Sequence, residues 1–174
     1  MSSAHTKKYL ATISTATPRQ IEEASTWYAE AQSVAEDVAE NLKVSLEHGA
    51  SVVAALSPRE RWSSNVAKAL AFSMGKPVVG LSNNLTMAKA SVELGFGALK
   101  GPKTNAFARA IAGDSGAVVI DTWMIRAAGL DPIKGINLGQ YRDLSKSVVS
   151  VARRVELTPR TTQALIWLIA RNEA

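Results

Sequence analysis

Lys103 and Asp121 are the two residues whose types and spacing best suit catalysis. The lysine follows a Gly-Pro turn. The aspartate stands eighteen residues later, after a short apolar run, so each is expected at the start of a helix. A lysine amine can attack an electrophilic carbon, and a carboxylate can stabilise the positive charge that develops there. Together they predict chemistry on a sugar carbon.

Each of the two residues also has an ordinary structural interpretation. A lysine at this position can simply be a surface side chain with its amine in water. An aspartate before TWMIRAAG is a standard helix N-cap, which accepts hydrogen bonds from the first turn. The two interpretations of Asp121 are compatible, because a capping carboxylate beside a cleft can also stabilise a developing cation.

Helical periodicity runs through most of the chain. The run TPRQ at 17–20 is a helix-start signal, and it predicts a long helix to His48 with Gly49 as its stop. Residues 51–56 form a short apolar piece that must be buried. Further helices are expected over about 59–74, over 84–94 with Ser82 or Asn83 as the cap, over 103–112, directly after Asp121, over 141–155, and from Pro159 onward.

The composition limits the class of protein. The 174 residues are enough for one domain with a sizeable core, and 47% of them are hydrophobic. The absence of cysteine excludes disulfides, thiolate metal sites and an iron–sulfur cluster. No apolar run approaches the roughly 20 residues that span a membrane, and the N-terminus does not have the form of a signal peptide. We expect one helical domain over 1–174, in the cytoplasm and away from membranes.

Positive charge is concentrated in one part of the chain. The net charge is +5, but residues 1–47 carry a balance of −3 and residues 48–174 a balance of +8. A basic surface attracts polyanions, and nucleic acid is the commonest of these. The alternative is that the high pI has no binding purpose, as in many small proteins.

Five segments of the chain resemble, in the same order, the helix-hairpin-helix (HhH-GPD) superfamily of DNA glycosylases. That family has a hairpin ending in Gly-x-Lys-Thr, then an apolar run into Asp-Thr-His-Val and an arginine. The matching segments are ALSPRE at 55–60, NVAKA at 65–69, GPKT at 101–104, VVIDTWMIR at 118–126 and QALIW at 163–167. The resemblance covers about residues 45–172 and leaves 17–48 as an additional N-terminal helical segment.

The resemblance implies an all-α, helix-hairpin-helix glycosylase-like fold with two helical lobes around a cleft. It implies a DNA N-glycosylase, with or without AP-lyase activity, that acts as a monomer on a damaged or modified base. The expected setting is a bacterial or phage-infected cell. The alternative on the same fold is a non-excising DNA-binding or phage base-modification protein. A helical interaction protein without a DNA partner is the third possibility.

The resemblance also assigns site residues, and it implies no metal and no cofactor. Lys103 would be the nucleophile, Asp121 would stabilise charge, and Trp123 would line the base pocket in place of the family's histidine. Arg59 stands where the family places a residue that fills the gap left by an extruded base. The hairpin, at 97–101, lacks one family glycine. The remaining DNA contacts implied are Lys100, Gly101, Thr104 and Arg126.

Overall fold

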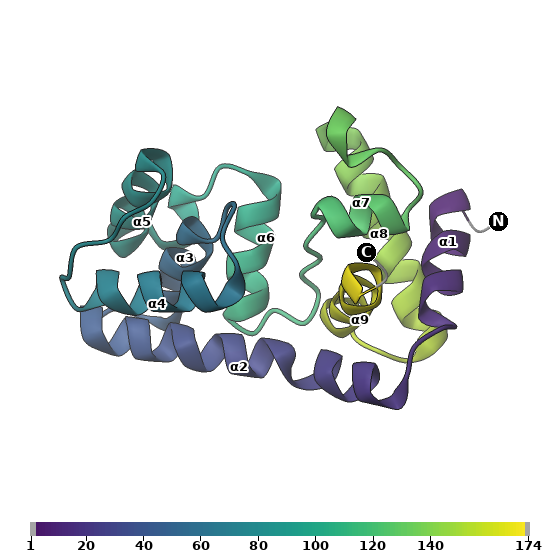
Figure 1. Cartoon of the computed structure of the whole chain (residues 1–174), viewed down its shortest axis with the longest axis horizontal. Coiled ribbons are helices and arrows are strands. Elements are labelled where there is room, and N and C mark those ends of the chain that lie inside the picture. The colour runs from purple at the N-terminus through teal and green to yellow at the C-terminus, as the bar shows by residue number, and fades with distance from the viewer. Residues whose placement is uncertain (1–2, 173–174) are drawn as a thin grey trace. The chain divides into compact units, whose positions relative to one another are not determined.

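The structure is a computed structural model that describes residues 3–172, and these residues form helices and no strand (Figure 1). The expectation of an all-α protein is therefore confirmed. The elements in chain order are α1 (Ala4–Ile13), α2 (Pro18–Leu42), α3 (Leu46–Leu56), α4 (Trp62–Ser73), α5 (Ser82–Leu94), the 3-10 helix η1 (Gly95–Ala98), α6 (Pro102–Ile111), α7 (Thr122–Ala127), the 3-10 helix η2 (Pro132–Lys134), α8 (Leu138–Val155) and α9 (Pro159–Asn172).

The helices form two compact units. Unit 1 combines the residues up to Tyr28 with those from Ser115 onward, and unit 2 is the continuous segment Ala29–Asp114. The chain passes from unit 1 to unit 2 inside α2, and it returns between Asp114 and Ser115. Unit 2 is therefore inserted between the two segments of unit 1.

Helix α3 is the centre of unit 2 and packs against α4, α5, η1 and α6. The residues from Gly49 to Leu56 are all buried, so the apolar piece at 51–56 lies in the core as its composition predicted. Helix α5 begins at Ser82 after Leu81, with no capping side chain. The expected cap from Ser82 or Asn83 is therefore wrong, because Ser82 is already the first helical residue.

The expectation of one helix from 17 to 48 is also wrong. Helix α2 ends at Leu42, Lys43 takes a left-handed conformation with φ 57°, and the Val44 N–H donates to the Ala39 carbonyl at 3.0 Å. Gly49 lies inside α3 rather than at a helix end. A Cβ at Gly49 would overlap the Ala35 carbonyl oxygen and lie 2.8 Å from the Ala39 Cβ. The glycine thus permits the close crossing of α2 and α3.

The core of unit 1 is built around Tyr9, Met124, Val148 and Ile166. Tyr9 is on α1, a helix that the sequence analysis did not anticipate because its apolar positions are few. Ser3 caps α1 by accepting a hydrogen bond from the Thr6 N–H. Tyr9 is fully buried, and its hydroxyl donates to the Met124 carbonyl at 3.1 Å. This contact ties α1 to α7.

A tyrosine on α8 fixes the extended segment that leads into α7. The Tyr141 hydroxyl donates to the Val118 carbonyl at 3.0 Å and accepts from the Ile120 N–H at 3.3 Å. One side chain thereby satisfies both polar groups of this buried backbone. The segment Ala117–Ile120 is buried against α8 and delivers Asp121 to a fixed position.

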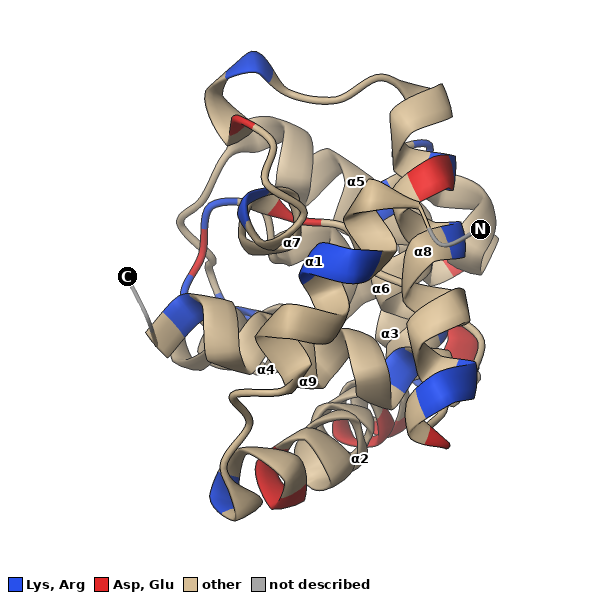
Figure 2. Ribbon diagram, turned by 90° about the vertical axis from the view of Figure 1, so that its right-hand side faces the viewer, with Lys and Arg blue, Asp and Glu red and all other residues tan. Residues whose placement is uncertain are grey.

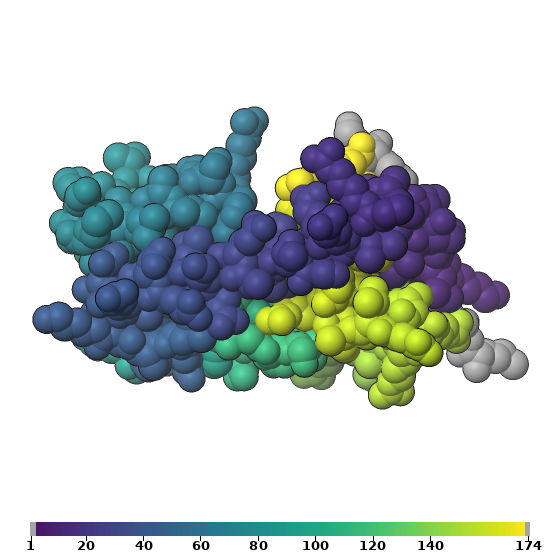
Figure 3. Space-filling view, turned by 90° about the horizontal axis from the view of Figure 1, so that it is seen from below, coloured from purple at the N-terminus to yellow at the C-terminus, as the bar shows by residue number. Residues whose placement is uncertain are grey.

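Charge is distributed unevenly over the helices. Helix α2, whose position Figure 3 shows in purple to blue, has five exposed acids and one exposed base. By contrast, Figure 2 shows Lys and Arg in blue along α8. This helix has four exposed bases and one exposed acid. A polyanion would therefore be repelled by α2 and attracted by α8. The exposed acids of α2 are Glu22, Glu30, Glu36, Asp37 and Glu40. None of the helices over residues 3–172 is long and apolar enough to cross a membrane.

The close crossing of α2 and α3 predicts the effect of Gly49→Ala. The added methyl group must displace backbone, so unfolding should become easier by about 1–3 kcal/mol. The matched control is Gly97→Ala, because a Cβ there would meet nothing closer than 3.8 Å. Its effect should stay within about 0.5 kcal/mol. Chemical denaturation of the two variants measures both values, and equal stabilities would contradict the packing argument.

The three tyrosines of the chain all lie in unit 1, and they predict how this unit responds to alkali. Burial is the main cause that raises the pKa of Tyr9, Tyr28 and Tyr141, and the negative charge of Asp121 raises each pKa further. The unfolded chain, with tyrosine pKa values of about 10, would lose these protons first. The stability of unit 1 should therefore be intact below about pH 10 and fall as the pH rises above it.

A titration followed by phenolate absorbance and by circular dichroism measures this response. Phenolate should form cooperatively with loss of helix, because the protons leave when unit 1 opens. A gradual phenolate signal near pH 10 with unchanged helical content would contradict the burial of the three hydroxyls.

Candidate functional site

Asp121 is held by three hydrogen bonds. It is the N-cap of α7, and its Oδ1 accepts from the Trp123 N–H at 2.9 Å and the Met124 N–H at 3.0 Å. Its Oδ2 accepts from the indole N–H of Trp167 at 2.9 Å. The capping interpretation is confirmed, and the carboxylate also joins α7 to α9. A carboxylate offers about four acceptor positions, so one remains beyond these three donors.

Trp167 is part of this site, which sequence reasoning did not foresee. The sequence analysis placed it only as a helical position in the last matching segment. Its ring lies 5.7 Å from the Trp27 ring, edge to face, and the Arg171 guanidinium stacks over it at 4.3 Å. Its partner Asp121 is 46 residues away in sequence, so no local pattern indicates the contact.

Trp123 and Arg126 follow Asp121 in the first turns of α7. Trp123 is half-buried, and the exposed Arg126 places its guanidinium 4.7 Å from the centre of the Trp123 ring. This cation–π contact covers one face of the indole. Asp121, Trp123 and Arg126 therefore belong to one local cluster in unit 1.

Lys103 stands at the start of α6 in unit 2. Gly101 is the N-cap and has no side chain, Pro102 is the first helical residue, and Lys103 is exposed. In the first backbone hydrogen bond of the helix, the Asn105 N–H donates to the Gly101 carbonyl. The N–H groups of Lys103 and Thr104 therefore have no capping side chain and point outward from the helix end. Such a helix start favours an anion.

The turn before α6 is held by Asn105, which sequence reasoning also missed. Its amide donates to the Phe96 carbonyl at 3.1 Å and the Leu99 carbonyl at 3.3 Å. The amide oxygen accepts from Arg109 Nε at 2.9 Å. The Lys100 amine donates to the Gly97 carbonyl at 2.9 Å. The turn from η1 to α6 is thus fixed to the helix that carries Lys103.

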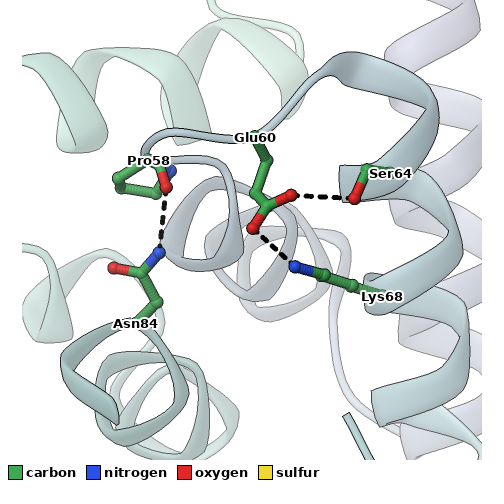
Figure 4. Close-up of polar contacts among 5 residues, drawn as sticks. All are labelled: Pro58, Glu60, Ser64, Lys68 and Asn84. Atoms are coloured by element: carbon green, nitrogen blue, oxygen red, sulfur yellow. Dashed lines mark hydrogen bonds and ion pairs between the residues drawn. The ribbon is translucent and has the colours of Figure 1, made fainter. Parts of the chain in front are cut away.

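Arg59 occupies the tip of a fixed loop between α3 and α4. It is exposed and takes a left-handed conformation with φ 66°, which is unusual for a residue other than glycine. Its neighbours are fixed, as Figure 4 shows. Asn84 donates to the Pro58 carbonyl at 3.2 Å. Glu60 accepts from Ser64 at 2.8 Å and pairs with Lys68. Strain of this kind is typical of functional loops.

The contacts of Glu60 change the pKa of its carboxyl group. Hydrogen bonds from Lys68 and Ser64 lower the pKa of the Glu60 carboxyl. The loop is therefore tied by a charged pair while Glu60 is ionised. Lys68 was identified as part of the NVAKA segment, but its partner was not.

The predicted site residues divide between the two units. Unit 2 carries the set expected to contact DNA through the hairpin and the Arg59 loop, together with Lys103. Within unit 2, the Trp62 ring at the start of α4 lies 6.4 Å from the Phe107 ring of α6, edge to face. The Arg59 loop and the Lys103 helix are therefore on neighbouring elements. Unit 1 carries Asp121 and its cluster.

The chain belongs to a family of unknown function (DUF7178), whose sequence pattern matches residues 1–174. No characterised protein and no solved structure matches the chain. Membership of this family assigns no activity, so any functional proposal depends on the residues and contacts of the chain itself.

The contact between Asp121 and Trp167 predicts an unusual pair of stability effects. Trp167→Phe removes the only donor to Oδ2 that the structure describes, and it should cost about 1–3 kcal/mol. Asp121→Asn keeps an oxygen for the cap but turns an amide N–H₂ toward the indole N–H, so two donors face each other. The double variant removes this conflict and should be more stable than the sum of the two single effects.

Asp131→Asn is the matched control, because Asp131 caps η2 through one oxygen and has no second donor in the described structure. It should leave the stability of unit 1 nearly unchanged. Thermal and chemical unfolding of the four variants gives the comparison. Additive effects of Asp121→Asn and Trp167→Phe would show that the indole contact is not made.

Proposed function

We propose that this protein is a DNA N-glycosylase, with Lys103 as its nucleophile and Asp121 as the group that stabilises charge. The observation that carries the proposal is the pair of local structures around these residues. Lys103 opens α6 after an uncapped Gly-Pro start, and Asp121 is held rigidly at the start of α7. These are the two settings in which the resemblance to helix-hairpin-helix glycosylases requires a lysine and an aspartate.

The proposed reaction begins with a nucleotide extruded from the duplex. The neutral Lys103 amine forms a bond to the anomeric carbon, the glycosidic bond breaks, and the base leaves with the bonding electron pair. The base takes up a proton that the lysine nitrogen loses. The sugar ring then opens, as the ring oxygen leaves the anomeric carbon and takes up the second proton of the lysine nitrogen, and this gives a Schiff base between Lys103 and the sugar. These steps conserve atoms and electrons without an oxidant, a metal or a cofactor.

Asp121 supports this reaction through its negative charge. As the glycosidic bond breaks, positive charge develops on the sugar ring, and a carboxylate fixed in advance stabilises it without reorganisation. Three N–H donors fix the carboxylate, and one acceptor position remains. Asp121 would thus act as an electrostatic group held in place, with Trp123 beside it as the wall of the base pocket.

The DNA contacts follow from the same elements. The uncapped N–H groups at Lys103 and Thr104 would hold a phosphate at the end of the turn that Asn105 fixes. Arg59, at the tip of its fixed loop, would enter the gap left by the extruded base. Lys100 would add positive charge beside the hairpin of unit 2, and Arg126 would add it beside Asp121 in unit 1.

Two observations favour a second candidate, a DNA-binding or base-modification protein that does not excise. The hydrogen bonds of Asp121 give it a complete structural purpose as a cap and an inter-helix link. A protein that had no use for catalysis would still need this aspartate. Arg126 also covers one face of Trp123, so that face is not free to line a base pocket. The two candidates share their partner and differ only in chemistry.

Borohydride trapping on DNA separates the two candidates. Wild-type protein incubated with duplexes that carry abasic, oxidised, alkylated, mismatched or hypermodified nucleotides should give a covalent adduct with at least one of them. Lys103→Gln should abolish the adduct, because glutamine has no nucleophilic amine. Lys100→Gln is the matched control, since it removes the same charge three residues away and should keep the adduct. Both variants should bind DNA to a similar extent.

Asp121→Asn tests the second group in the same assay. Turnover should fall by about two orders of magnitude or more, because an amide cannot replace the charge of the carboxylate. The rate is compared at a temperature where the variant remains folded, since Asp121 also stabilises unit 1. Full activity of Asp121→Asn would overturn the mechanism. A wild-type protein that is inert on every substrate would favour the non-excising candidate.

A further inference from the structure

A groove on unit 1 lies between α8 and the extended segment that leads to Asp121. Its volume is about 410 Å³, and it is open to solvent along its length. Val118 and Val149 form its apolar floor, while Ser145, Ser150, Lys146 and Arg153 supply its polar lining. All of these residues belong to unit 1, and none was identified as a site residue from the sequence.

The two cations of the groove are available for a ligand. Lys146 and Arg153 are exposed, and no hydrogen bond or ion pair among residues 3–172 engages either of them. They are seven residues apart on α8, which places them on one face of the helix about 10 Å apart along its axis. Arg142 extends the same line by about 6 Å beyond Lys146. The positive charges therefore form a row.

A row of charges suits an extended anion better than a compact one. A nucleic-acid strand carries one charge for about every 3.4 Å of helix axis, so it could meet them in succession. A serine hydroxyl such as that of Ser150 is a typical partner of phosphate oxygens, whereas the Ser145 hydroxyl donates to the Tyr141 carbonyl at 2.9 Å. A small ligand is usually buried over most of its surface, which this open groove does not offer.

We propose that the α8 groove is a nucleic-acid contact, in which Lys146 and Arg153 bind the phosphates of one strand. This contact is separate from the helix start at Lys103. The inference rests on the proposed glycosylase function because both require nucleic acid as the partner. It does not depend on any chemistry at Lys103. Within unit 1, α8 carries four exposed bases and one exposed acid, so its surface attracts a polyanionic strand.

The experiment measures the salt dependence of binding by the full chain to a fluorescent single-stranded oligonucleotide and to the matching duplex. The groove variant is Lys146→Gln/Arg153→Gln. The matched control is Lys7→Gln/Arg19→Gln, which removes two exposed charges of unit 1 outside the groove. Each lost phosphate contact should lower the slope of log affinity against log salt by about one.

The slope of log affinity against log salt should therefore be smaller by about two for the groove variant than for the wild-type protein. For the control variant this slope should hardly change. Equal slopes for the two variants would overturn the inference. Polyglutamate is added as a competitor at equal charge. If it displaces the oligonucleotide from wild-type protein as well as unlabelled DNA does, the groove takes an acidic peptide and the inference is wrong.

The outcome is distinguishable from failure of the glycosylase proposal. If no substrate gives a borohydride adduct but DNA binding by the groove variant is still less dependent on salt, only the proposed chemistry is wrong. If the wild-type protein and the groove variant give the same slope while the adduct forms, only the groove inference fails. Circular dichroism of all variants excludes unfolding as the cause of weaker binding.

Discussion

The carboxylate of Asp121 sets the arrangement of unit 1, because it binds α7 through two backbone N–H groups and α9 through the Trp167 indole. A charged acceptor shared by two helices resists displacement of either one. Tyr9 and Tyr141 strengthen the same point, since their hydroxyls fix the backbone on both sides of it. The residue proposed for charge stabilisation is therefore also the residue whose loss would loosen its own surroundings.

In unit 2, close packing of helices rather than a charged group sets the arrangement of the core. Gly49 lets α2 and α3 approach until their backbones meet, and the small, apolar residues that follow it fill the centre. Two segments that carry candidate site residues lie at the edge of this core, and an amide side chain holds each of them. Asn105 fixes the turn before Lys103, and Asn84 fixes the loop that carries Arg59. The exposed candidate residues Lys103 and Arg59 therefore lie on backbone segments that hydrogen bonds hold in place.

Local rules predicted the features that depend on neighbouring residues. The helix start at Lys103 and the cap at Asp121 follow from glycine, proline and aspartate at particular positions, and both are found. The misreading of Gly49 as a helix stop shows the limit of these rules, since glycine can also be needed for packing that only the fold reveals. The contact of Trp167 with Asp121 joins distant parts of the sequence, so no spacing could indicate it.

The insertion of unit 2 between the two segments of unit 1 has a consequence for synthesis on the ribosome. Unit 2 is continuous, so it can fold as soon as residues 29–114 have emerged. Helix α1 has no such opportunity, because its partners α7, α8 and α9 are made last. Tyr9 must remain exposed while unit 2 and the later helices are translated, so a helix made before unit 2 packs into its own unit only after unit 2 is complete.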